Sequence, residues 1–254
     1  MESPVDANRP GWWLSFYPAA REGGGSFVSS RPPQRSYVAR GHAADPERAA
    51  VEAGRRARTN LRRYGAANGL NRLATLTYAG EGVRDPHELR RDVGAFFRDL
   101  RSELGGKPVP YLWVPEWHPG GHGLHAHFVV GKFVPYRLIK ATWGRGIVNI
   151  KLIGHLGVGS GVLEEARKAA GYLSKYVAKT FDDSETRVLG LHRYEIAQGF
   201  KPAKVRIYGT HPGSVIDQAS EMLEAQPSRV WSSDDEETWH GPPAIWAQWA
   251  GARG

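Results

Sequence analysis

The stretch LHAHFVV at residues 124–130 is the most informative part of this 254-residue chain. Successive side chains of a β-strand point to opposite faces, so a strand here places His125 and His127 on one face and Ala126 and Phe128 on the other. The apolar face fits a buried core, and the histidine face is suited to chemistry. Two strand histidines are also compatible with half-buried polar residues that bind nothing, so the interpretation depends on what accompanies them.

Paired imidazoles at this spacing can share one divalent cation. The chain contains no cysteine, so a metal site must be built from His, Asp or Glu. Glu116 is the best carboxylate, because it lies near the end of the strand-like segment 111–117, and a hairpin closing through HPGGHG brings that segment beside 124–131. His118 and His122 lie in this connection and are alternatives, as metal ligands or as DNA contacts.

The segments around this hairpin predict an α+β fold. LATLTY at residues 73–78 fits a central strand, and two Asp-Pro pairs, at 45–46 and 85–86, begin helices that run to about Tyr64 and to the Gly105-Gly106 pair. Further elements are expected as a short helix at 134–143, a strand at 147–153, a helix from about 162 to 179 after the glycine-rich GVGSG, and strands near Val188 and at 204–208. This order favours a central antiparallel sheet covered by helices, without βαβ repeats.

Composition divides the chain into three expected parts. Residues 1–44 are rich in Pro, Gly and Ser and are expected to be irregular, with an aromatic cluster at residues 12–17 packed on the body. Residues 45–215 are expected to form the catalytic domain, and residues 216–254 an acidic tail that contains tryptophans. No apolar run is long enough for a membrane span and no signal peptide is recognisable, so we expect a soluble, cytoplasmic protein without membrane association.

The net charge of +8 is unevenly distributed. Residues 217–254 hold seven acidic side chains against two arginines, a balance of −5, so the rest of the chain carries +13. A basic body is expected of a protein that binds the phosphate backbone, although many basic proteins bind no nucleic acid. The helix from residue 46 has six arginines, and we predict DNA contacts for Arg55, Arg58 and Arg62; a solvated helix face is the alternative.

The expected helix at 162–179 carries the sequence YLSKYVAK. Tyr172 and Tyr176 are four residues apart and share one helix face, with Lys175 and Lys179 beside them. Tyrosines at helical spacing are more often packing residues than catalytic ones, so this pattern is weak when it stands alone.

Together these residues resemble the HUH endonucleases, and among them the replication initiators of rolling-circle replicons. Three motifs occur in the family's order, namely Thr75-Leu76-Thr77 in the first strand, His125-Ala126-His127 in the hairpin, and the helix with Tyr172 and Tyr176. The paired tyrosines look most like the initiators of small isometric single-stranded DNA phages and related plasmids. The resemblance spans roughly residues 73–180 and implies an HUH or RRM-like palm.

The resemblance implies a metal-dependent DNA nicking and strand-transfer enzyme. Its metal, Mg²⁺ or Mn²⁺, would be held by His125, His127 and Glu116, and a tyrosine would form a 5′-phosphotyrosine and release a 3′-hydroxyl, with Lys175 and Lys179 stabilising the developing charge. The two lysines flank Tyr176 and slightly favour it as the first nucleophile. The implied partners are single-stranded origin DNA and a host helicase and polymerase, because no Walker A motif follows.

Three other functions stay open from sequence alone. The same chemistry serves conjugative mobilisation and transposition. A non-catalytic DNA-binding protein would use the histidines and tyrosines only for structure. A metallohydrolase acting on small phosphoesters would turn over without any protein-linked intermediate.

Overall fold

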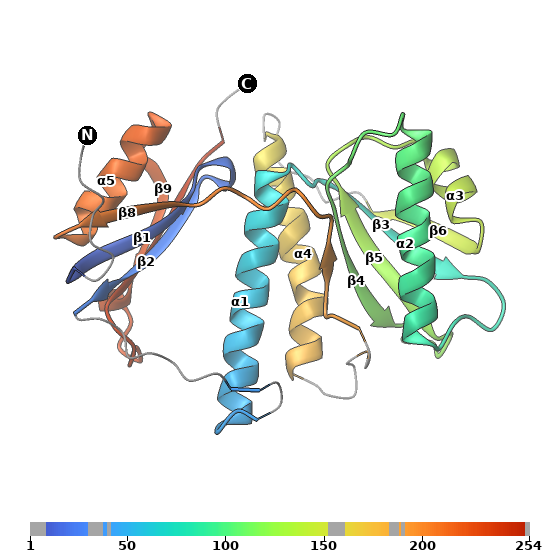
Figure 1. The fold of residues 1–254 in the computed structure, drawn as a ribbon, viewed down its shortest axis with the longest axis horizontal. Coiled ribbons are helices and arrows are strands. Elements are labelled where there is room, and N and C mark those ends of the chain that lie inside the picture. The colour runs from blue at the N-terminus through green and yellow to red at the C-terminus, as the bar shows by residue number, and fades with distance from the viewer. Residues whose placement is uncertain are drawn as a thin grey trace. The chain divides into compact units, whose positions relative to one another are not determined.

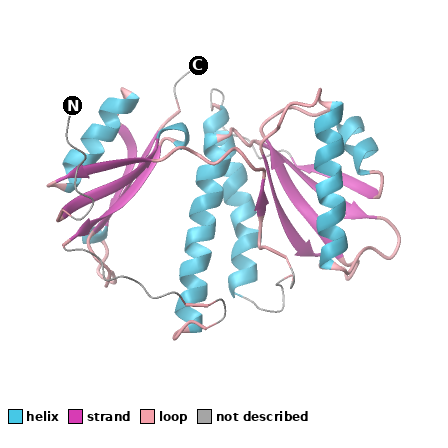
Figure 2. Ribbon diagram, in the orientation of Figure 1, coloured by secondary structure: helices cyan, strands magenta, loops and turns pink. Residues whose placement is uncertain are grey.

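The computed structural model describes residues 9–29, 38–39, 42–151, 161–182, 188 and 191–251, with the backbone alone at 178–182. The chain divides into two compact units, one formed by Ala43–Lys201 and the other by Met1–His42 together with Pro202–Gly254. Each unit contains a five-stranded antiparallel sheet and at least one helix, which confirms the predicted α+β class (Figures 1 and 2).

The unit Ala43–Lys201 contains the predicted hairpin at the middle of its sheet. The sheet has the strand order β6-β3-β5-β4-β7, so β5 pairs with both β3 and β4. In chain order, the elements of this unit are α1 (Pro46–Ala67), β3 (Arg72–Tyr78), α2 (Pro86–Glu103), β4 (Tyr111–Trp117), β5 (Leu124–Val130), α3 (Tyr136–Trp143), β6 (Gly146–Lys151), α4 (Val162–Asp182) and β7 (Glu195–Ile196).

Each face of this sheet is covered by a different helix pair, as Figure 1 shows. On one face, Phe96 of α2 and Trp143 of α3 pack with Phe128 of β5. On the other, Leu61 of α1 and Leu173 of α4 join a second core cluster. Burying an aliphatic or aromatic side chain of this size contributes roughly 1.5–3 kcal/mol. The alternation of β5 therefore works as predicted, although both faces of the strand are covered.

The predicted helix starts and hairpin are confirmed by their local contacts. The side chain of Asp45 accepts a hydrogen bond from the Arg48 amide at 2.9 Å and caps α1, and Asp85 caps α2 in the same way through His87. In the turn between β4 and β5, Gly123 has φ +78°, and a Cβ there would overlap the Val83 carbonyl oxygen. Only glycine fits this approach, which fixes the hairpin register.

The second unit corrects the expectation that residues 1–44 are irregular. Its sheet has the order β8-β1-β2-β10-β9, so strands from both ends of the chain pair with one another. Its elements are β1 (Gly11–Tyr17), a 3-10 turn (Pro18–Ala20), β2 (Glu22–Val28), β8 (Val205–Gly209), α5 (Pro212–Leu223), β9 (Pro227–Ser232), a second 3-10 turn (Ser233–Asp235) and β10 (Ala244–Trp249).

The aromatic residues of these end segments form the core of their own sheet. Phe16 and Trp249 are fully buried, with ring centroids 5.4 Å apart, and α5 covers this face through Val215. The glycines of β2 made that segment look like a linker. At Gly25 a Cβ would overlap the Trp13 carbonyl, so this glycine permits close strand pairing rather than disorder.

These contacts move two of the expected boundaries. Residues 202–215 were expected in the catalytic domain, but β8 and the start of α5 belong to the other unit; residues 216–254 are the remainder of that unit's fold rather than a separate tail. Val188 is buried but lies in no strand. The sequence GVGSG lies outside the described residues except for Gly161. No helix in the described part of the chain has the length and apolar character needed to cross a membrane.

Candidate metal centre and tyrosine pair

One face of the central sheet changes from apolar to polar along its strands. On β5, Val129 lies in the core under α1 and α4, whereas His127 and His125 follow on the same face. On β4 the same change runs from Val114 to Glu116. Strand alternation keeps these side chains on one face, so the polar end of this face is a direct product of the sequence pattern.

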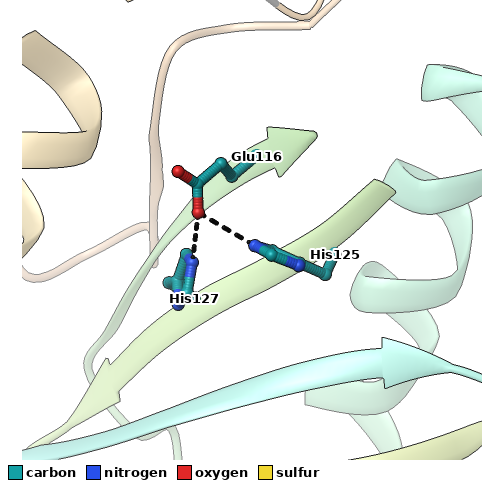
Figure 3. Close-up of side chains that lie close together, drawn as sticks. All are labelled: Glu116, His125 and His127. Atoms are coloured by element: carbon teal, nitrogen blue, oxygen red, sulfur yellow. Dashed lines mark hydrogen bonds and ion pairs between the residues drawn. The ribbon is translucent and has the colours of Figure 1, made fainter. Parts of the chain in front are cut away.

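Glu116, His125 and His127 converge at this polar end (Figure 3). Glu116 pairs directly with His125 across the hairpin, and its Oε2 atom lies 2.9 Å from Nε2 of His125 and 2.7 Å from Nε2 of His127. One ligand atom from each of the three residues lies within 4.8 Å of the others. Both histidines are buried and the carboxylate is partly so. This group could hold a metal ion.

The electrostatics of the cluster keep its members in the states that bind cations. Burial alone would raise the pKa of Glu116, but hydrogen bonds to the two histidines outweigh burial and lower this pKa to about 2. Burial also lowers the pKa of His127, against the opposing effect of its hydrogen bond to Glu116. A charged carboxylate beside a neutral imidazole is the protonation state that a divalent metal requires.

His127 is held on its other side by two contacts. Its Nδ1 atom lies 2.8 Å from Oγ1 of Thr75 on β3, and its ring stacks on the ring of Tyr176, with centroids 4.1 Å apart and planes at 20°. His125 is held differently, because its Nδ1 is buried without a hydrogen-bond partner among the described residues. Its ring lies edge-on to that of His118, at 5.4 Å between centroids.

The tyrosine pair lies next to the cluster on α4. The hydroxyl oxygens of Tyr172 and Tyr176 are 2.5 Å apart, as the four-residue spacing allows. Nζ of Lys151, the last residue of β6, donates a hydrogen bond of 2.8 Å to the Tyr172 hydroxyl and lies 4.0 Å from the centre of its ring. Lys151 and Tyr172 thus join an edge of the sheet to the helix.

The two phenols differ in their electrostatic environment. Burial would raise the pKa of Tyr172, but the hydrogen bonds from Lys151 and Tyr176 and the charge of Lys151 outweigh it and lower the pKa below its ordinary value. Burial raises the pKa of Tyr176, and the hydrogen bond and charge of Tyr172 raise it further. The pair therefore ionises more easily at Tyr172.

The structure brings together part of the set predicted from sequence. His118 and His122 do not join the metal-binding group that Glu116 completes. Lys175 is exposed on α4, and the side chain of Lys179 lies outside the described residues.

The arginines predicted to contact DNA all lie on α1. Arg55 is exposed, whereas Arg58 and Arg62 are partly buried. At positions 55, 58 and 62 their spacing places the three side chains along one stripe of the helix. Nothing in the structure of the free chain tests whether this stripe contacts nucleic acid.

Lys151 is the site residue that sequence reasoning missed. It ends the predicted strand at 147–153 and pairs with Leu73, whose side chain belongs to the core cluster under α1 and α4. Paired residues share a face of the sheet, so Lys151 is directed to the same side as the histidines. The sequence offered strand alternation as a signal, but only with a known register could it be used.

A comparison with protein families matches residues 71–181 to the family model of the replication-associated protein ORF2. The match is less than half of the chain, and it runs from just before β3 almost to the end of α4, so it contains the metal-binding group, Lys151 and both tyrosines. It supports a replication-associated function for this protein. Comparisons with curated proteins and with solved structures found no match.

Proposed function

We propose that this protein is a site-specific single-stranded DNA endonuclease and strand transferase that initiates rolling-circle replication. The observation that carries the proposal is the position of the tyrosine pair against the group Glu116, His125 and His127, with Tyr176 stacked on His127. The family match over the same residues supports the assignment to replication. A phosphodiester at this place would meet a nucleophile and a cation site together.

The side chains of the group fit Mg²⁺ or Mn²⁺. Two imidazole nitrogens and a carboxylate oxygen face one another, and imidazole donors favour Mn²⁺ over Mg²⁺, whereas Mg²⁺ is the more abundant ion. When bound, such an ion polarises a non-bridging phosphate oxygen and reduces the repulsion of an incoming nucleophile. Glu116, His125 and His127 would be its protein ligands.

A tyrosine of α4 then supplies the nucleophile. The phenol loses its proton to solvent, its oxygen forms a bond to phosphorus, and the bond between phosphorus and the 3′ oxygen breaks. The leaving oxygen takes up a proton and becomes a 3′-hydroxyl, while the downstream strand stays on the tyrosine as a 5′-phosphodiester. Deprotonating an ordinary phenol near neutral pH costs roughly 3–4 kcal/mol, so the environment of the tyrosines matters.

The nicked strand serves replication because the free 3′-hydroxyl is a primer for a host polymerase, with a host helicase supplying the unwinding. The second tyrosine can repeat the transfer when the replicated origin returns, so that the bond energy kept in the phosphotyrosine link is used for rejoining. The basic charge of the chain before residue 217 favours binding of the phosphate backbone, with Arg55, Arg58 and Arg62 as the proposed contacts.

The test uses single-stranded oligonucleotides tiled across the DNA on both sides of the coding gene, each fluorescent at its 3′ end. Incubation with MnCl₂ followed by denaturing electrophoresis should give a fluorescent protein band, because the 3′ part of the cut strand stays attached. The control is the double variant Tyr172→Phe, Tyr176→Phe. Absence of this band for every oligonucleotide would favour a non-catalytic DNA-binding protein, and hydrolysis of small phosphoesters without the band would favour a metallohydrolase.

Replication is separated from mobilisation and transposition by a cellular test. A plasmid that carries only this gene, its flanking DNA and a resistance marker should replicate and accumulate single-stranded circles. The same plasmid with the double tyrosine variant should be lost. Nicking in vitro with no replication in the cell would assign the enzyme to strand transfer for another purpose.

A further inference from the structure

Lys151 makes a direct contact with the tyrosine pair, and it does so from the sheet rather than from the helix. Its ammonium group donates to the Tyr172 oxygen at 2.8 Å, whereas Tyr176 meets the metal-binding group through its ring, which stacks on His127. The two tyrosines therefore have different surroundings, although their spacing on α4 makes them look equivalent.

We infer that Tyr172 performs the first strand transfer and that Lys151 is the positioning residue that holds its oxygen for attack. This inference rests on the proposed nicking function and goes beyond it by assigning different roles to the two tyrosines. It replaces the preference for Tyr176 that followed from Lys175 and Lys179. Lys175 is exposed, and the side chain of Lys179 lies outside the described residues.

The geometry explains how Lys151 acts on one tyrosine more than on the other. An ammonium group 2.8 Å from the Tyr172 oxygen and 4.0 Å from its ring centre restricts rotation of the phenol and places positive charge where the oxygen becomes negative. The Tyr172 oxygen is 2.5 Å from that of Tyr176, so the hydroxyl of either tyrosine can donate to the other. With Lys151 donating to Tyr172, negative charge is better tolerated on Tyr172 than on Tyr176.

The contact is also open to a DNA strand. Lys151 is exposed and Tyr172 is partly exposed. During the first transfer the Tyr172 oxygen forms the bond to phosphorus, its proton passes to solvent, and the 3′ oxygen departs and is protonated. Lys151 keeps its own proton throughout, and its charge offsets that of the approaching phosphate. Tyr176 would then act in the second transfer.

The experiment measures adduct formation on each tyrosine separately. Tyr176→Phe leaves only Tyr172, and Tyr172→Phe leaves only Tyr176. Each background is combined with Lys151→Met, which keeps the length of the side chain without its charge, and with Lys151→Arg, which keeps the charge. Lys140→Met on α3 is the control for loss of one exposed positive charge. The probe is the oligonucleotide that gives the strongest adduct with the unsubstituted protein.

We expect Lys151→Met to slow adduct formation on Tyr172 at least tenfold and to change the rate on Tyr176 less than twofold. Lys151→Arg should restore the Tyr172 rate to within about threefold, and Lys140→Met should change neither rate. Peptide mass spectrometry of the unsubstituted protein after a single turnover should find the nucleotide on Tyr172. Melting temperatures of all variants show whether each of them is folded.

The two proposals fail in distinguishable ways. A first-turnover adduct on Tyr176, an equal loss on both tyrosines, or no loss with Lys151→Met would overturn the role of Lys151 and leave the nicking function intact. No adduct on either tyrosine of the unsubstituted protein, with any oligonucleotide, would overturn the nicking function and this inference with it.

Discussion

Thr75 and His127 are directly opposite each other on β3 and β5, and the Thr75 hydroxyl lies 2.8 Å from Nδ1 of His127. The other ring nitrogen of His127 faces Glu116. A hydroxyl can donate or accept, so Thr75 can hold this ring whichever nitrogen carries the proton. The threonine of the first strand motif thereby has a structural reason to precede the histidine motif.

We predict that Thr75→Val weakens Mn²⁺ binding about tenfold, because partners behind a metal ligand typically contribute 10–100-fold in metal affinity. Valine has nearly the same shape, so packing on β3 is retained. Isothermal titration with MnCl₂ measures the change. Thr77→Val is the matched control, since Thr77 lies opposite His125 on the same two strands. Equal affinities for Thr75→Val and the unsubstituted protein would show that the contact does not orient the ligand.

Removal of any of the three ligands should abolish nicking. We expect His125→Ala and His127→Ala each to lower Mn²⁺ affinity by more than a hundredfold and to remove the DNA adduct, and Glu116→Ala to have a smaller effect on affinity. Calorimetry and adduct formation are measured on the same preparations, with circular dichroism as the check on folding. His118→Ala is the control, because His118 lies near the group but does not belong to it. Full activity of both histidine variants with Mn²⁺ would eliminate the site.

Glu116 should make the stability of the metal-free protein depend on pH. Its pKa is lowered to about 2 from an ordinary value of 4.5, so its contribution is fully present above pH 4.5 and is lost as the pH falls toward 2. Glu116→Gln should therefore lower the free energy of unfolding by about 1–3 kcal/mol at pH 7, since hydrogen bonds to charged groups contribute this much.

The difference between the two proteins should shrink below pH 4.5. Urea unfolding in the presence of EDTA at pH 7, 5, 4 and 3 provides the measurement. A difference that stays constant from pH 7 to pH 3 would mean that the charge of Glu116 is not what the histidines stabilise.

The double variant Tyr172→Phe, Tyr176→Phe should bind single-stranded DNA and Mn²⁺ but form no covalent adduct. Phenylalanine retains the ring, including the stacking of residue 176 on His127, so only the hydroxyl chemistry is removed. The lost hydrogen bonds should cost about 1–3 kcal/mol in stability, which thermal unfolding can measure. A nucleotide found by mass spectrometry on a residue outside α4 would contradict the mechanism.

Neutralising the arginine stripe of α1 should reduce the salt dependence of DNA binding. For single strands each phosphate contact contributes about 0.7 to the slope of log K against log salt, so the triple variant Arg55→Gln, Arg58→Gln, Arg62→Gln should lower the slope by up to about 2. Fluorescence anisotropy at several salt concentrations gives the slope. The control is Arg48→Gln, Arg56→Gln, because both of these arginines pair with Glu52. Equal slopes for the triple variant and the unsubstituted protein would place the stripe in solvent.

The parts of the fold that sequence predicted are those set by neighbouring residues. The Asp-Pro pairs begin α1 and α2 because the aspartate caps the helix locally, and the hairpin between β4 and β5 closes because a glycine is required at residue 123. Strand alternation likewise placed His125 and His127 on one face, and helix periodicity placed Tyr172 beside Tyr176. Short-range geometry determines each of these features, so a sequence pattern is sufficient to predict it.

Only the tertiary structure decided which distant segments meet. β1 pairs with β8, and β2 with β10, although composition made both ends of the chain look like appendages. Lys151 reaches Tyr172, and Thr75 reaches His127, through strand register and helix packing. Strand pairing uses backbone hydrogen bonds that any residue can make, so partner and register depend on how the whole core packs. The sequence alone therefore determined the chemical groups of the site, and the packing of α4 on the sheet decided which tyrosine lies beside Lys151.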